Sequence, residues 1–341
     1  MNENRKQIAV VGGTGYTAHE LIRLLTGHPK VNLAAVTSES EAGKSLAEYY
    51  PDLVPAPELI FQRLSEIETG RLDLAFLCTP HGRSQKIAPL FLKNNVRVID
   101  LSGDYRLRTP DQYRFWYRHP HSDPEHLAQA VYGLPEFNRE KIARARLVAN
   151  PGCYPTGALL ALLPLAKAGI LAGNRIIIDA KSGVSGAGKT PTHRTHFVEI
   201  NENISPYSAG HQHRHIGELE QELEAHSDRS FSVLFTPQLV PLSRGILETI
   251  YVETDRSAEE VLGVLQDTYA EEPFIKIWRG GLPDIRSAAS GNVCHIGALA
   301  ERSLRTLILV AAFDNLIKGA SGEAVQNMNL LFGWDETLGL L

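Results

Sequence analysis

The segment QIAVVGGTGYTA, residues 7–18, decides the fold of this chain. Its first five residues form a short apolar strand, and Gly13, Gly15 and Ala18 then fit the pattern G-x-G-x-x-G/A. Residues 19–25 place apolar side chains on one helical face, and a second strand follows at 32–36. A glycine turn between strand and helix is typical of dinucleotide binding, because it lets the backbone approach a pyrophosphate at the helix N-terminus. The alternative is an α/β domain that uses the glycines only for a tight turn.

The same alternation continues to about residue 150. Strands are predicted at 73–78, 96–101 and 146–149, with a helix at 84–93 between the first two. This order predicts a Rossmann-type, doubly wound parallel sheet that binds ligands at the C-terminal ends of its strands. The turn residues that we expect to bind the cofactor are Gly12, Gly13, Thr14, Gly15, Tyr16 and Thr17.

A different pattern follows residue 150. Strand-like runs occupy 175–180, 231–236, 245–253, 292–298 and 306–310, and helical stretches at 218–224 and 258–269 lie between them. This predicts an α+β domain with a mostly antiparallel sheet. We therefore expect a dinucleotide-binding domain at 1–150 and a catalytic and substrate domain at 151–312. A C-terminal helix, within about 313–341 and most regular over 315–328, should pack back on the first domain.

Composition excludes several classes of protein. The 341 residues are 43% hydrophobic and 21% charged, which is typical of a globular chain. The net charge of −5 favours neither nucleic acid nor an anionic membrane as a partner, and no apolar run is long enough to span a bilayer. The N-terminus has no apolar signal-peptide region, and three cysteines are an odd number for a disulfide framework. We expect a reducing, cytoplasmic location.

The hexapeptide NPGCYP, residues 150–155, places a thiol where it should be most reactive. A strand precedes it, and the apolar run 156–163 that follows reads as a helix, so Cys153 lies at a strand-to-helix turn. Unpaired N–H groups and the positive end of a helix dipole favour thiolate over thiol there, and thiolate is the nucleophile. A buried structural cysteine is the alternative, and it is how we interpret Cys78 and Cys294, which lie within apolar runs.

Histidines cluster just before the predicted helix at 218–224. His211, His213 and His215 occupy alternate positions, and such spacing is compatible with zinc. No cysteine lies nearby in the sequence, and a reactive thiol needs a base rather than a metal. We therefore predict an acid/base histidine here and no metal site; a merely solvated polar loop is the other alternative.

The octapeptide GVSGAGKT, residues 183–190, matches the P-loop pattern G-x-x-x-x-G-K-[ST]. A working P-loop opens an apolar helix, whereas the six residues after Thr190 are polar, and no strand ending in a magnesium-binding Asp is evident. Phosphate or acyl-oxygen binding by backbone N–H groups beside Lys181 and Lys189 remains open. Arg244 stands between two strands, where it either presents a planar fork to a substrate anion or is an ordinary exposed arginine.

Taken together, these segments resemble the N-acetyl-γ-glutamyl-phosphate reductase family, within the aspartate-semialdehyde dehydrogenase-like superfamily. The resemblance spans essentially the whole chain and is most specific in the Cys153 hexapeptide and the Ser/Gly loop. The matching segments are GGTGYT (12–17), PHG (80–82), DLSGD (100–104), YGLPE (132–136), VANPGCYPT (148–156), DAKSGVSGAG (179–188), HRH (213–215), RGIL (244–247), DNLIKGA (314–320) and AVQNMN (324–329).

The resemblance implies a function for the individual residues. It implies reductive dephosphorylation of an acyl phosphate in arginine biosynthesis: Cys153 forms a thioester, NADP(H) carries the hydride, and inorganic phosphate is released. His215, or else His213, is the implied acid/base group. The further cofactor-binding residues that we predict are Ser38, Ser185, Gly186 and Asn315, and the predicted substrate-binding residues are Ser182, Arg244 and Asn150. A wide sheet also suggests a homo-oligomer.

Several alternatives remain open at this stage. Many relatives carry a basic residue after the second strand to hold the 2′-phosphate of NADP, whereas residues 37–40 offer hydroxyls and Glu39, so NAD is a competing cofactor. The substrate can instead be N-acetyl-aminoadipyl phosphate or aspartyl phosphate. A P-loop ATPase and a non-enzymatic, redox-sensing nucleotide binder are the two alternatives from other classes.

Overall fold

The computed structural model describes residues 5–54, 58–289, 291–301, 303 and 305–341. The chain divides into two compact units. Unit 1 comprises Met1–Pro151 together with Ala320–Leu341, and unit 2 comprises Gly152–Gly319. The assignment of cofactor binding to the N-terminal part and of catalysis to the central part stays a prediction at this level.

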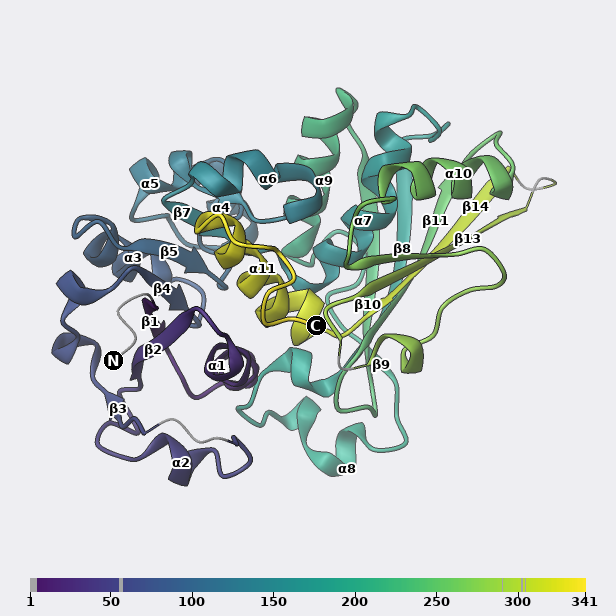
Figure 1. The fold of residues 1–341 in the computed structure, drawn as a ribbon. Coiled ribbons are helices and arrows are strands. Elements are labelled where there is room, and N and C mark those ends of the chain that lie inside the picture. Colours follow the sequence, from purple (N-terminus) through teal and green to yellow (C-terminus); the bar gives the residue numbers. More distant parts are fainter. Residues whose placement is uncertain (1–4, 55–57, 290, 302, 304) are drawn as a thin grey trace. The chain divides into compact units, whose positions relative to one another are not determined.

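Unit 1 is built on a seven-stranded parallel sheet (Figure 1). Its strand order is β3-β2-β1-β4-β5-β7-β6, so the order reverses direction between β1 and β4. In doubly wound sheets, ligands bind at such a reversal, outside the C-terminal strand ends. The predicted N-terminal fold class is therefore confirmed. The strands are β1 (Lys6–Val11), β2 (Val31–Thr37), β3 (Phe61–Gln62), β4 (Leu74–Leu77), β5 (Arg97–Asp100), β6 (Val131–Tyr132) and β7 (Leu147–Ala149).

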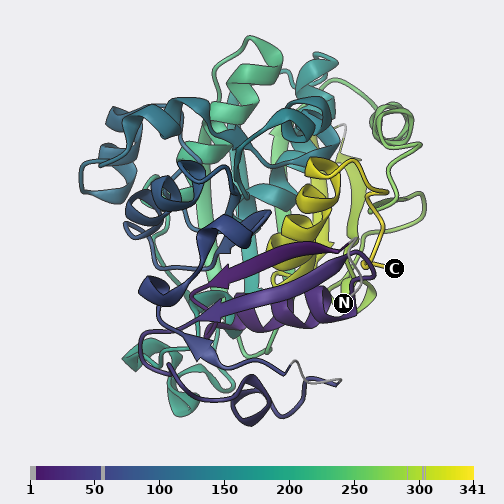
Figure 2. The same ribbon diagram turned by 60° about the vertical axis from the view of Figure 1, so that its left-hand side comes forward.

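Helices cover both faces of this sheet, as a doubly wound fold requires. One apolar core joins residues of α1, α6 and α11 to one face, and a second core joins α3 and α5 to the other. Figure 2 shows α1 lying along β1 and β2. The helices of unit 1 are α1 (Tyr16–Gly27), α2 (Leu46–Tyr49), α3 (Ser84–Leu92), α4 (Pro110–Tyr117), α5 (Pro124–Gln129), α6 (Pro135–Arg144) and α11 (Gly322–Leu331).

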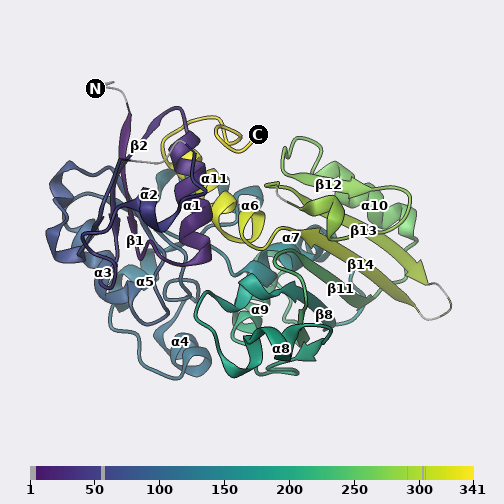
Figure 3. The same ribbon diagram turned by 90° about the horizontal axis from the view of Figure 1, so that it is seen from below.

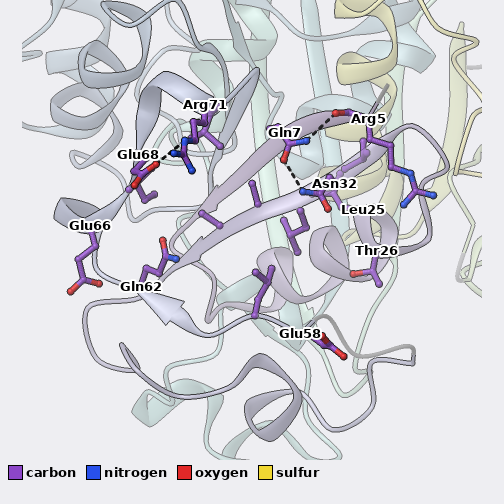
Figure 4. Close-up of a pocket in the computed structure, with 17 residues that line it drawn as sticks. Arg5, Gln7, Leu25, Thr26, Asn32, Glu58, Gln62, Glu66, Glu68 and Arg71 are labelled. Atoms are coloured by element: carbon purple, nitrogen blue, oxygen red, sulfur yellow. Dashed lines mark hydrogen bonds and ion pairs between the residues drawn. The ribbon is translucent and has the colours of Figure 1, made fainter. Parts of the chain in front are cut away.

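The outer edge of β2 is only partly paired. β3 pairs with Val36 and Thr37 alone, at the C-terminal end of the strand. A pocket of 650 Å³ lies along the rest of this edge, between Arg5 and Gln7 on one side and the segment 66–72 on the other (Figure 4). No residue of the glycine turn lines it, so this pocket is separate from the predicted cofactor site.

Unit 2 contains a second seven-stranded sheet, of order β12-β13-β14-β11-β8-β10-β9. Four of its six strand pairs are antiparallel; β8 with β10 and β12 with β13 are the parallel ones. The predicted mostly antiparallel α+β architecture is therefore confirmed. The strands are β8 (Arg175–Gly183), β9 (Ser205–Pro206), β10 (Ser232–Val240), β11 (Ile246–Glu253), β12 (Ile275–Trp278), β13 (Cys294–Glu301) and β14 (Thr306–Phe313).

One face of this second sheet is covered by helices. α7 (Cys153–Lys167) packs on β11 and β14, α9 (His215–Ser227) on β10, and α10 (Ala258–Thr268) on β12 and β13 (Figure 3). A short helix, α8 (Phe197–Ile200), is separated from these helices in Figure 1. Side chains on the opposite face stay partly exposed. There, cross-strand pairing aligns five apolar residues in one row across five strands: Leu234, Ile177, Tyr251, Ile308 and Leu299.

The predicted C-terminal helix over 315–328 begins later than its sequence pattern indicates. The structure has a π-helical turn at Ile317–Ser321, and the α-helix starts only at Gly322. The Asp314 carboxylate accepts the N–H of Leu316 at 2.9 Å, and the Asp314 carbonyl accepts the N–H of Gly319, five residues on, at 2.9 Å, which is the hydrogen bond of a π-helical turn. Among the described residues, no helix is both long enough and apolar enough to cross a membrane.

Candidate active site

Cys153 is the first residue of α7. The preceding Gly152 is extended (φ −68°, ψ 150°) and no side chain caps the helix. Cys153 is half-buried, whereas the following helical residues are buried as far as Ala166. The thiol therefore lies at the N-terminus of a buried helix, near first-turn N–H groups that stabilise negative charge.

The histidine pair lies at the start of the neighbouring helix. His215 is the first residue of α9, and α9 packs against α7 (Figure 1). The ring of Tyr154, the residue after Cys153, meets the rings of both His213 and His215 edge-on at centroid distances of 5.9 Å. The structure thus brings the predicted nucleophile and both predicted histidines to two adjacent helix N-termini within unit 2.

The two histidines differ in electrostatic environment. Burial, together with the positive charge of the neighbouring Arg214, lowers the pKa of His213 to about 3. Its Nδ1 accepts the backbone N–H of His215 at 3.2 Å, so the proton of the neutral ring sits on Nε2. His213 is therefore neutral at physiological pH, with one ring nitrogen committed to the backbone.

Glu218 is a residue that the sequence analysis missed. Its side chain is fully buried in the first turn of α9, and one carboxylate oxygen accepts the N–H of Gly152 at 2.9 Å. The other oxygen lies 4.0 Å from Nε2 of His215. Glu218 thus links the turn before Cys153 to the histidine. An acid three positions after a histidine on a helix was the available signal.

Two tyrosines line the same region. The hydroxyls of Tyr154 and Tyr207 are 2.9 Å apart. Burial raises the pKa of Tyr154, and it raises the pKa of Tyr207 to about 12, so both stay protonated at neutral pH. Ser182, a predicted substrate residue, is buried, and its hydroxyl donates to the carbonyl of Gly183 at 2.9 Å.

The Ser/Gly loop does not have the geometry of a P-loop. The N–H groups of Gly183, Val184 and Ser185 donate to carbonyls of the 242–245 turn at 2.8 to 3.1 Å. A phosphate cradle requires these N–H groups to point at the ligand. A 3₁₀ turn occupies Val184–Ala187, and the residues after Lys189 form an exposed turn rather than an apolar helix. The ATPase alternative therefore lacks its structural basis.

Arg244 and Asn315 have internal partners. The Arg244 guanidinium holds the buried Asp314 carboxylate through Nε at 2.7 Å and Nη2 at 3.1 Å. Asn315 accepts the N–H of Gly245 at 2.7 Å and donates to the Ser185 hydroxyl at 3.0 Å. Three predicted binding residues, Arg244, Ser185 and Asn315, thus belong to one hydrogen-bonded loop cluster. Gly186 lies beside it: a Cβ there would come within 2.8 Å of the Ser182 hydroxyl.

In unit 1 the glycine turn is close-packed on one side and open on the other. Gly12 has φ +84°, and a Cβ on Gly13 would come within 2.2 Å of the Val36 side chain. Gly15, the N-cap of α1, would place a Cβ in open space, and no side chain caps this helix. Thr14, Tyr16 and Thr17 complete the turn. The uncapped helix start with room before it fits a dinucleotide pyrophosphate.

The other two predicted residues of unit 1 are buried. Ser38 follows β2, and its hydroxyl accepts the N–H of Glu41 at 3.2 Å. The Asn150 amide donates to the carbonyl of Ala320 at 3.1 Å and accepts from Asn327 at 3.0 Å. Both ends of the Asn150 side chain therefore hold the end of β7 to the segment leading into α11. No group of three or more potential metal ligands is formed by the described residues.

Comparison with known proteins agrees with this architecture. The family model for the semialdehyde dehydrogenase NAD-binding domain matches residues 7–145, and the model for the semialdehyde dehydrogenase dimerisation domain matches residues 153–315. N-acetyl-gamma-glutamyl-phosphate reductases from Geotalea daltonii and Methanococcus maripaludis are 45% and 43% identical, over 98% of this chain and 97% and 98% of theirs. The chain belongs to the N-acetyl-γ-glutamyl-phosphate reductase family. Members of this family are oxidoreductases, so the chain is an enzyme of that class.

Solved structures show the same fold at greater evolutionary distance. Aspartate semialdehyde dehydrogenase II from Vibrio cholerae superposes with a TM-score of 0.75 at 22% identity, over 96% of this chain and 99% of that one. Aspartate semialdehyde dehydrogenase with NADP from Candida albicans gives 0.72 at 18% identity, over 96% and 98%. The N-acetyl-γ-glutamyl-phosphate reductase family thus shares its architecture with these dehydrogenases, and the NAD-binding family model implies a nicotinamide dinucleotide cofactor.

Proposed function

We propose that this chain reduces N-acetyl-γ-glutamyl phosphate to N-acetylglutamate 5-semialdehyde and inorganic phosphate, using NADPH. The observation that carries the proposal is the packing of α7 against α9, which brings the ring of Tyr154, the residue after Cys153, to 5.9 Å from the ring of His215. The names of relatives at about 45% identity supply the substrate. A thiol–imidazole pair is the usual arrangement for thiol-based acyl transfer.

In the first step the thiolate of Cys153 attacks the γ-acyl carbon. The C–O bond to the phosphate breaks, inorganic phosphate leaves, and a thioester on Cys153 remains. The first-turn N–H groups of α7 favour the thiolate and are candidates to bind the transient oxyanion. Splitting the reaction in this way replaces one difficult step by two easier ones.

In the second step the thioester carbon is reduced. The nicotinamide ring, when bound, supplies the hydride, and the glycine turn of unit 1 would hold the dinucleotide. His215 then gives a proton to the thiohemiacetal oxygen and takes it back as the C–S bond breaks, which releases the aldehyde and restores the thiolate. We assign this role to His215 rather than His213, because the pKa of His213, about 3, is too low for proton exchange near neutral pH.

A phosphate-release experiment without cofactor tests the covalent step. Mixing the enzyme with N-acetyl-γ-glutamyl phosphate alone should release about one phosphate per active site, after which a semialdehyde appears only when NADPH is added. Release of no phosphate, or aldehyde formation by a Cys153→Ala variant, contradicts the thioester mechanism. In the reverse direction, rates with phosphate and each of the N-acetylglutamate, N-acetyl-aminoadipate and aspartate semialdehydes decide among the three substrates.

We also propose that two copies associate through the open face of the unit 2 sheet. Support comes from the row of apolar side chains across five strands, in which Leu234 and Leu299 are 45% and 51% exposed. The dimerisation-domain model spans this sheet. Contiguous exposed apolar surface is typical of an interface. A charge at Leu234 (Leu234→Glu) should shift the scattering mass of the protein toward the monomer, whereas the same change at Val54, an isolated exposed residue of unit 1, should not.

A further inference from the structure

We propose that Arg63, from the strand next to β2, supplies the cation for the 2′-phosphate of NADP(H), and that Glu39 is turned away from the cofactor. In dinucleotide-binding folds the residues after the second strand reach the adenine ribose, where an acid selects the 2′-hydroxyl of NAD and an arginine accommodates the 2′-phosphate of NADP. Glu39 alone therefore predicts NAD. The inference rests on the proposed use of NADP(H).

Sheet register places Arg63 beside this ribose-reading position. β2 and β3 are parallel, with Val36 opposite Phe61 and Thr37 opposite Gln62. The N–H of Ser38 continues the ladder by donating to the carbonyl of Gln62 at 3.0 Å. Ser38 and Arg63 are consequently the next pair in register, both at the C-terminal edge of the sheet, where ligands bind. Arg63 is exposed there.

The Glu39 carboxylate is held by the β3 side of this edge. One of its oxygens accepts the N–H of Leu64, the residue after Arg63, at 3.1 Å. This N–H lies at the start of the 3₁₀ turn Leu64–Glu66, so the carboxylate occupies the turn's positive end. One Glu39 oxygen is thus engaged by the backbone of the residue next to Arg63 rather than free for a ribose hydroxyl.

The turn after Ser38 is suited to an anion. The Ser38 and Ser40 hydroxyl oxygens are 3.3 Å apart, and the second acid of the turn, Glu41, is neutralised by Lys44 at 2.6 Å. Hydrogen bonding to Glu41 raises the pKa of Lys44, so this ion pair persists at neutral pH. A third acid, Glu66, accepts the backbone N–H of Arg63 at 2.8 Å. With Glu41 paired and both Glu39 and Glu66 held by backbone N–H groups, serine hydroxyls and the Arg63 guanidinium remain as partners for a phosphate monoester.

Binding of nucleotide fragments tests this assignment without turnover. Calorimetry of the full-length enzyme should show that Arg63→Ala weakens binding of 2′,5′-ADP about tenfold or more and leaves 5′-AMP unchanged, since one charge-assisted contact is worth about 1.4 kcal/mol or more. Arg71→Ala is the matched control. Arg71 is also an exposed arginine, but it pairs with Glu68 and lies before β4 rather than at a C-terminal strand end.

Glu39→Gln gives the complementary result. We expect it to change the affinities for NADP and NAD by less than about threefold, because the amide oxygen can still accept the Leu64 N–H. The inference is overturned if Arg63→Ala binds 2′,5′-ADP like the wild type, or if Glu39→Gln loses NAD affinity while gaining NADP affinity. Arg63-dependent binding of 2′,5′-ADP without turnover of any semialdehyde would instead contradict the proposed reaction and leave this inference standing.

Discussion

The helices α1 and α7 both begin at a glycine without a side-chain cap, but the space in front of them is used differently. At α1 a Cβ on Gly15 would contact nothing within 4 Å, so the helix start is open. At α7 the N–H of Gly152 is bound by the buried Glu218 carboxylate, and the helix starts with Cys153 itself. An open helix N-terminus can bind an anionic group of a ligand, whereas a helix N-terminus that carries a cysteine stabilises the thiolate of that cysteine. In the proposed mechanism the same backbone feature, an uncapped helix start, would bind the cofactor in one unit and carry the nucleophile in the other.

The largest effect should come from removing the thiol. Cys153→Ser should lower the rate of phosphate-dependent semialdehyde oxidation at least about 1000-fold, because a serine hydroxyl is not ionised at this helix start. Dinucleotide affinity, measured by fluorescence titration of NADPH, should stay within about twofold of the wild type. If Cys153→Ser keeps its activity, the start of α7 does not supply the nucleophile and the proposed difference between the two helix starts is wrong.

Separate substitution of His215 and His213 tests which of them is the acid/base group. His215→Asn should lower kcat about 100-fold, the usual contribution of an acid/base group. His213→Asn should cost much less, because His213 is already neutral above its pKa of about 3 and accepts a backbone N–H that asparagine can also accept. The pH dependence of kcat should persist in His213→Asn. The reverse ranking of the two variants would transfer the proton-transfer role to His213.

The open start of α1 is tested by filling it. Gly15 has an ordinary negative φ of −83°, so Gly15→Ala should fold normally and change Tm little. If the backbone approaches a pyrophosphate there, the added methyl should weaken NADPH binding about tenfold. Gly13→Ala is the informative contrast, since its Cβ would collide with Val36 and lower stability as well. Unchanged NADPH affinity in a folded Gly15→Ala protein would place the dinucleotide elsewhere.

Local sequence patterns predicted the parts of the site that depend on neighbours along the chain. The strand, glycine turn and helix of residues 7–25 and the helix start at Cys153 are local, and the structure contains both. Contacts between residues far apart in the chain were not predicted by any local sequence pattern. Glu218 reaches Gly152 across 66 positions, and Asn327 reaches Asn150 across 177. Their roles depend on strand order and helix packing, which a single sequence does not encode in any short window.

The start of the predicted C-terminal helix likewise depends on contacts that local sequence patterns do not predict. Leu316, Ile317 and Ala320 have helical spacing, but the Asp314 carboxylate takes the N–H of Leu316, and the Asn315 side chain accepts the N–H of Gly245, 70 positions away. The chain then makes a π-helical turn at Ile317–Ser321, and the α-helix begins only at Gly322. The sequence pattern therefore identified the helix but not the residue at which it begins, and all ten residues of α11, polar ones included, are buried.

The smallest expected effect is a change in stability and comes from Glu248, in the interior of unit 2. Glu248 lies fully buried on β11, and its carboxylate approaches α7 at Gly157, where a Cβ would come within 2.6 Å of Oε2. Burial raises its pKa well above 4.5, so the folded state keeps the acid protonated at pH values where the unfolded chain ionises it. The unfolded chain therefore binds fewer protons, and stability falls as pH rises above about 4.5 until the folded-state pKa is reached.

Glu248→Gln removes this titration while keeping the shape of the side chain. We expect Tm at pH 8 to rise by about 3 °C or more and the decline of Tm between pH 5 and 8 to flatten. Glu253→Gln, an exposed position on the same strand, should leave both unchanged. Neither carboxylate oxygen of Glu248 has a hydrogen-bond partner among the described residues. Loss rather than gain of stability in Glu248→Gln would therefore mean that the ionised carboxylate is stabilised in the fold. It would also mean that α7 tolerates negative charge along its body as well as at the start that carries Cys153.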